Sequence, residues 1–138
     1  IFRFHLVDNT RGEPTMWRRE HIRTNQLWLH VEAVTAQEVR LRVEGGVLLA
    51  TRADVAQADR GYHASLLGYL TYDPGSKTIR RFDMLSVGEH WGVGAHTRRD
   101  SRPGRAPLGI AFELSKGDSP ADRVAPQAAR ELREYFGD

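Results

Sequence analysis

The strongest feature of this sequence is a two-residue alternation of apolar and polar side chains, the period of a β-strand with one buried face. Residues 26–33 (QLWLHVEA) and 38–43 (EVRLRV) both alternate in this way. The residues Thr35-Ala36-Gln37 lie between the two runs and form a link short enough for a hairpin. This pattern predicts an antiparallel sheet.

A second hairpin is predicted from turn residues. Residues 66–72 and 77–86 are both strand-like, and Asp73-Pro74-Gly75-Ser76 separates them. Proline presets φ for the second position of a turn, and Gly75 suits the positive φ that a type II turn requires next. We therefore expect two long strands joined at this turn.

The rest of the chain contains weaker signals, each read from local pattern. Gly45-Gly46 precedes an apolar run at 47–50 that suits a strand covered on both sides, and residues 54–59 suit one helical turn. Extended stretches are also predicted at 1–10, 87–97 and 108–114. An amphipathic helix is predicted near 120–136, with Pro126 in its first turn and Gly137 as C-cap. Its apolar face would consist of Ala128, Leu132 and Phe136.

Seven or eight short strands in a sequential meander, closed by one helix, indicate a single mainly β domain over residues 1–138, with strands over roughly 1–114. A small antiparallel barrel is expected, because closure removes exposed sheet edges. A β-sandwich and a curved open sheet packed on the helix are the alternatives. The architecture resembles the calycin and lipocalin-like barrels. The resemblance transfers no residue, since Trp17 lies in Met16-Trp17-Arg18 without the glycine of the lipocalin G-x-W motif.

Composition excludes several classes of protein. The absence of cysteine excludes disulfide scaffolds, zinc ribbons, iron–sulfur sites and thiol chemistry. No apolar run reaches the roughly 18 residues of a membrane span. With 20 Lys+Arg against 18 Asp+Glu, the net charge of +2 argues against an obligate nucleic-acid binder. All the bases except Lys77 and Lys116 are arginine, which is typical of a GC-rich, bacterial genome.

The stretch from Asp83 to Thr97 is the candidate ligand site. It holds two histidines, two carboxylates and a tryptophan among three glycines. An extended conformation places Glu89 and Trp91 on one face and His90 and His96 on the other. Glycines beside a large aromatic side chain can leave room for one small ligand in a barrel. The predicted ligand-binding residues are Trp91, His90, Glu89, Tyr69, Phe82 and Arg80.

A metal site is the alternative for the same stretch. Glu89 and His90 offer the carboxylate and imidazole that zinc, copper or non-haem iron bind, and His63 or His96 would supply a third ligand. The two histidines at 90 and 96 lie about 20 Å apart on an ideal strand, which argues against a simple pair. No HExxH spacing is present.

The loop from 96 to 105 carries the one strong local basic patch. Its arginines are Arg98, Arg99, Arg102 and Arg105, and guanidinium groups bind phosphate or carboxylate through two parallel hydrogen bonds. An anionic ligand or an acidic partner could dock there. No aromatic residue is interleaved with them, which argues against single-stranded nucleic acid.

Three functions follow from these features. The first is a non-enzymatic β-barrel module that binds an apolar or amphipathic small molecule. The second is a metal-dependent enzyme or metal-binding domain that uses Glu89 and His90. The third is an accessory protein-interaction domain of a larger protein, or a homo-oligomer, with the 98–105 loop or an open sheet edge as its contact surface. No nucleophile elbow or phosphate-binding loop is present, so no catalytic residue or cofactor is assigned.

The chain begins at Ile1 rather than Met, which predicts processing, trimming or excision from a longer chain.

Overall fold

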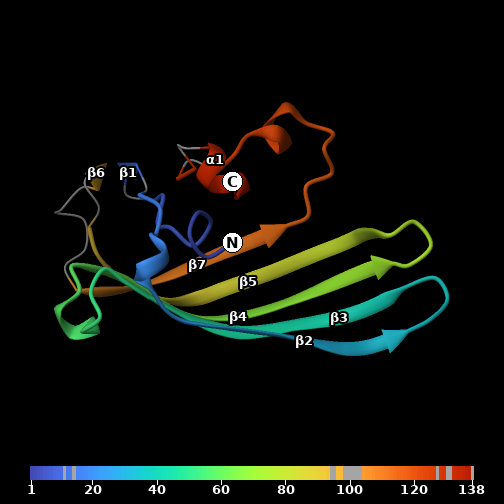
Figure 1. Cartoon of the computed structure of the whole chain (residues 1–138), viewed down its shortest axis with the longest axis horizontal. Helices are drawn as coiled ribbons and strands as arrows, with labels where there is room; N and C mark the ends of the chain where they lie inside the picture. Colours follow the sequence, from blue (N-terminus) through green and yellow to red (C-terminus); the bar gives the residue numbers. More distant parts are fainter. Residues whose placement is uncertain are drawn as a thin grey trace.

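A five-stranded antiparallel sheet with the strand order β2-β3-β4-β5-β7 forms the centre of the protein (Figure 1). The computed structural model describes residues 1–10, 12–13, 15–93, 96–97, 104–126, 128–129 and 132–137. The strands are β2 (Ile22–Val34), β3 (Val39–Ala50), β4 (Arg60–Asp73), β5 (Thr78–Gly92) and β7 (Arg105–Glu113), and β1 (Gly12–Glu13) pairs with β6 (His96–Thr97) in a separate ladder.

Both predicted hairpins are confirmed, and each is longer than the sequence pattern indicated. The strands β2 and β3 pair from Ile22 to Val34, and β4 and β5 pair along nearly their whole length. The extended stretch expected at 87–97 is not separate, because β5 runs without a break to Gly92. The positive φ of the second turn lies at Lys77 (57°) and not at Gly75, so the predicted type II geometry is wrong.

Asp73 shapes this second turn from its first position. The backbone amides of Gly75 and Ser76 donate to its Oδ1 at 2.8 and 3.2 Å, and Arg80 pairs with its other oxygen. The hydrogen bonds from Ser76 hold the pKa of the Asp73 carboxyl below its ordinary value, with a smaller effect from Arg80. The turn therefore takes its shape from an aspartate side chain that bonds the backbone ahead of it.

The sheet is open. The strands β2 and β7 are its two edges, and no pairing joins them in the part of the chain that the structure describes. Closure into a barrel is therefore not confirmed, and the open-sheet alternative agrees with the topology. An apolar sheet face can be buried by covering segments as well as by closure. Figure 1 shows the N-terminal segment and α1 on one side of the sheet, with the β2–β3 and β4–β5 turns extending away from them.

Residues 1–10 are not the strand that their apolar pattern predicted. They form turns, with the amide of His5 donating to the carbonyl of Ile1 at 3.0 Å. Phe4, Leu6 and Val7 are buried in this segment. Apolar side chains can cover a sheet without pairing with it, so alternation alone did not distinguish the two cases.

Helix is scarce, and the C-terminal helix is shorter than expected. The described residues contain 3₁₀ turns at Arg19–His21, Val55–Gln57 and Pro120–Arg123 and one α-helix, α1 (Leu132–Phe136). The expected apolar face is also wrong, because Ala128 is buried while Leu132 and Phe136 are exposed. No helix in the described ranges is long and apolar enough to cross a membrane.

The core lies between the sheet and the N-terminal segment. Trp17 is fully buried there, and its indole N–H donates to the carbonyl of Leu6 at 2.6 Å. Even-numbered residues of β4 and β5 face this core, including Tyr62, whose hydroxyl lies 2.9 Å from Ser86 Oγ. Burial raises the pKa of Tyr62, although the Ser86 hydrogen bond lowers it in part. The remaining main members of the cluster are Val7, Val43, Val47, Leu49, Ala64, Leu66, Met84 and Ala128.

Candidate functional site

The predicted ligand-binding residues lie on two faces of the sheet. Glu89 is exposed on the face opposite the core, and His90 is buried on the core face. Trp91 lies on the same face as Glu89, as the period of the strand predicted. A single site therefore does not contain both Glu89 and His90.

His90 joins β5 to the N-terminal segment and to β7. Its Nδ1 lies 3.0 Å from the carbonyl oxygen of Ala106, and its Nε2 lies 3.2 Å from Asp8 Oδ2. The other carboxylate oxygen of Asp8 accepts the backbone amide and the hydroxyl of Thr10. The His90 and Asp8 side chains are only 5% and 8% exposed. This buried contact between Asp8 and His90 fastens the covering segment to the sheet.

Trp91 packs against its own sheet. Its indole N–H donates to the carbonyl of Ala58 at 3.2 Å, and the guanidinium of Arg105 lies 4.2 Å from its ring centroid. A Cβ placed on Gly61 would lie only 2.0 Å from the ring, so the glycine makes room for it. Trp91 thus covers a glycine and is itself covered by an arginine.

The three remaining ligand candidates lie toward the far end of β4 and β5. Trp91 pairs in register with Gly61, whereas Tyr69 lies eight residues further along β4, or about 26 Å away on a strand. Phe82 is partly buried on the core face, and Arg80 pairs with Asp73 at the turn. The structure therefore does not bring these candidates together with Trp91.

The structure brings one pair of the proposed metal ligands together and places another pair on opposite faces of the sheet. His63 and Glu89 are register partners on the same face, while His90 lies on the opposite face. No group of three or more possible ligands occurs among the residues that the structure describes. Of the basic loop, Arg98, Arg99 and Arg102 lie outside the described residues, and Arg105 has a nitrogen 3.7 Å from a Glu89 oxygen.

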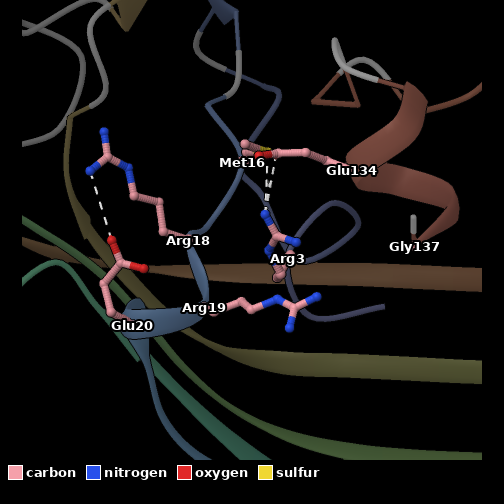
Figure 2. Close-up of a pocket in the computed structure, with 7 residues that line it drawn as sticks. All are labelled: Arg3, Met16, Arg18, Arg19, Glu20, Glu134 and Gly137. Carbon is pink, nitrogen blue, oxygen red and sulfur yellow. Dashed lines mark hydrogen bonds and ion pairs between the residues drawn. The ribbon is translucent and has the colours of Figure 1, made fainter.

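A cleft that the sequence did not predict lies between the N-terminal segment, the first 3₁₀ turn and α1 (Figure 2). Its volume is about 530 Å³. Arg3 crosses it to pair with Glu134 at 3.3 Å, and Arg18 lies 3.8 Å from Glu20. The lining residues are Arg3, Met16, Arg18, Arg19, Glu20, Glu134 and Gly137.

His21 ends the 3₁₀ turn that forms one wall of this cleft. The amide of Arg18 lies 3.3 Å from its Nδ1, a contact that needs an unprotonated ring nitrogen. Burial lowers the pKa of His21, and nearby arginines lower it further against the opposing effect of Glu20. The turn therefore favours neutral His21.

The largest unexplained feature is the sheet face opposite the core, which we call the uncovered face. Leu67 and Leu85 are direct register partners in its centre, and Val87 lies next to them along β5. Ala111 of β7 follows Leu85 in the same row, and Trp28 of β2 begins that row. The large apolar side chains exposed on this face are Trp28, Leu67, Tyr69, Leu85 and Val87.

Charged residues of both signs border this apolar centre, and one of them, Glu44, lies within the central row between Trp28 and Leu67. Arg42 pairs with Glu44, and His30 Nε2 lies 3.2 Å from the same glutamate. On β5, Arg81 pairs with Asp83. An apolar centre with a charged border is the usual anatomy of a protein–protein interface. The sequence signal for this face was present, because residues 66, 67, 84, 85 and 87 are apolar at both odd and even positions.

Comparisons with protein-family models, with curated proteins and with solved structures found no match to this chain.

Proposed function

We propose that this domain is a non-enzymatic protein-interaction module and that the uncovered face is its contact surface. The observation that carries this proposal is the contiguous exposure of Leu67, Leu85 and Val87 on one sheet face, with Trp28 in the same row beyond Glu44. Exposed apolar residues scattered singly need no explanation, whereas a contiguous patch with a polar border marks an interaction site. The partner is a protein surface with an apolar centre and charges of both signs around it.

The division of the sheet supports this assignment. One face is buried over β3, β4 and β5 under the N-terminal segment, which Asp8 and His90 hold in place, while its β2 edge leaves Leu29 exposed. The other face consists of regular, paired strands whose backbone groups are already hydrogen-bonded, so it offers side chains on a rigid platform. Neither feature depends on closure into a barrel.

Site-specific photo-crosslinking in cells that produce the protein tests the proposal. A benzophenone amino acid at Val87 should give a covalent protein adduct, and the same group at Val124 is the control. Val124 is also an exposed valine, but it lies after the last 3₁₀ turn and outside the uncovered face. Equal or absent adducts at the two positions would refute the proposal.

Small-molecule binding is a second candidate, at a different place from the one that the sequence suggested. The observation that favours it is the cleft of about 530 Å³, at which Arg19 has no ion pair among the described residues. A groove of about 600 Å³ lined by Phe2, Phe4 and Phe136 also includes Arg3 in its wall. Together they suit an amphipathic anion, with its apolar chain in the groove and its charge near Arg19.

Calorimetric titration with decanoate tests this second candidate. Replacement of Arg19 by glutamate should weaken binding at least about tenfold, which corresponds to about 1.4 kcal/mol. The matched control is Arg52→Glu, which changes an exposed arginine outside the cleft. Equal affinities of the two variants would remove the cleft as the site.

A further inference from the structure

We infer that the partner of the uncovered face is a second copy of this chain, packed face to face about a two-fold axis that runs along β4. This inference rests on the proposed function and names its partner. The sheet order makes β4 the central strand, with β3 and β5 beside it and β2 and β7 at the edges (Figure 1). A two-fold axis parallel to β4 therefore sets β3 opposite β5 of the second copy, and β2 opposite its β7.

The size of the facing side chains is complementary in this arrangement. The central row reads Trp28, Glu44, Leu67, Leu85 and Ala111 across the five strands. The axis sets Leu67 against its own copy and the large Trp28 against the small Ala111. In the adjacent row, Val87 comes to lie opposite Gly46. A large residue thus faces a small one at these two positions, whereas Glu44 faces Leu85 of the second copy in the central row.

The charges of the facing side chains are complementary as well. The next row reads His30, Arg42, Tyr69, Asp83 and Glu113. The same axis sets Arg42 opposite Asp83 of the second copy, and His30 opposite its Glu113. Each contact occurs twice because the interface is symmetric. Pairs of this kind contribute to orientation and specificity more than to affinity.

The competing two-fold axis, perpendicular to the strands through Leu67, lacks these matches. It would stack Glu44 on Glu44 of the second copy, which is a like-charge contact. It would also set Asp83 opposite the apolar Val87, which would desolvate a carboxylate. The axis along β4 also sets one carboxylate, Glu44, opposite an apolar side chain, so it is the Arg42–Asp83 contact and the absence of a Glu44–Glu44 contact that favour it.

The area of the face suits a dimer of ordinary size. Five strands about 4.8 Å apart and about four rows of side chains give a surface of roughly 24 by 27 Å, or about 650 Å² before side-chain relief is counted. A standard interface buries about 800 Å² on each partner. Packed sheets cross at about 30°, so the axis is tilted by about 15° from β4, which keeps the central rows opposed and separates the outer ones.

Analytical ultracentrifugation of two matched variants tests which face is used. Leu85 is 55% exposed on the uncovered face, and Leu29 is 58% exposed on the opposite side of the same sheet, where its register partner Val43 is buried. The unmodified chain should dimerise at about 1–100 µM, and Leu85→Lys should raise the dissociation constant at least about tenfold. Leu29→Lys should leave it unchanged, with circular dichroism confirming that both variants are folded.

A charge exchange tests the axis itself. Arg42→Asp and Asp83→Arg should each weaken the homodimer, because each variant places like charges opposite one another twice. Mixing the two variants restores both opposite-charge contacts, so native mass spectrometry should show mainly the mixed dimer. A mixture with no preference for the mixed dimer would overturn the proposed axis.

The remaining outcomes separate this inference from the proposed function. A chain that stays monomeric at about 100 µM, or a dimer weakened by Leu29→Lys and not by Leu85→Lys, would overturn the second copy as occupant. If the Val87 crosslink then contains a different protein, the interaction function stands with that protein as partner. If Val87 gives no more adduct than Val124, both the function and the inference fail.

Discussion

Removal of the Asp8 carboxylate should destabilise the fold strongly, because the ion pair that it makes is buried. Three pairs of oppositely ionisable side chains among the described residues have the same N–O distance of 3.2 Å, and two of them, His90–Asp8 and Arg52–Asp59, differ most in burial. The first is 5% and 8% exposed, and the second is 57% and 71% exposed. Because the distance is matched, a comparison of Asp8→Ala with Asp59→Ala tests the effect of burial, with the cation and the Thr10 hydrogen bonds of Asp8 as the other differences.

The expected magnitudes follow from this difference in exposure. Breaking a buried pair by removal of one partner costs about 3–5 kcal/mol, and we expect about 3 for Asp8→Ala, since its second oxygen bonds the exposed Thr10. Asp59→Ala should cost less than about 0.5 kcal/mol. Asp8→Asn should cost about 1 kcal/mol, because its amide can still donate to one neighbour and accept from another.

Urea unfolding followed by tryptophan fluorescence measures these differences, since Trp17 lies in the core beneath the covering segment. At a slope of about 2 kcal/mol per molar, Asp8→Ala should lower the midpoint by roughly 1.5 M. Equal midpoints for Asp8→Ala and Asp59→Ala would refute the reasoning from burial. Equal losses for the alanine and asparagine variants at position 8 would show that charge, and not hydrogen bonding, sets the value.

Three further predictions concern pH and the backbone. The pKa of His21 is lowered in the folded state, so His21 binds a proton more readily in the unfolded chain. The free energy of unfolding should therefore fall as pH drops through about 6.5. His21→Gln should reduce the difference between the unfolding free energies measured in urea at pH 8 and pH 5. Lys77→Gly should raise the unfolding free energy by roughly 0.5–1 kcal/mol, because φ is 57° there; a loss of thermal stability would contradict this. Gly88→Ala should lower the free energy of unfolding by more than about 2 kcal/mol, because the added Cβ would lie 2.0 Å from the His63 carbonyl oxygen. The control is Gly109→Ala, whose Cβ would meet no atom within 4 Å and which should leave the thermal stability nearly unchanged.

Local physics explains which parts of the fold could be predicted. The hairpins β2–β3 and β4–β5 were predictable because strand period and turn residues act between neighbours in the chain. The faces of β5 were also predictable, since Glu89 and His90 must point to opposite sides of one strand. No local pattern shows which strand face is buried, and the structure places the candidate ligand residues on both faces.

The sequence by itself determined the strands, their order along a meander and the alternation of their side chains. Only the tertiary structure decided that the sheet stays open, that residues 1–10 cover it, and that Asp8 meets His90. The physical reason is that closure and covering both bury the same apolar face, so the alternation is equally compatible with either. The uncovered face follows from that decision, because the N-terminal segment covers β3, β4 and β5 on one face only and leaves Leu67 and Leu85 exposed on the other.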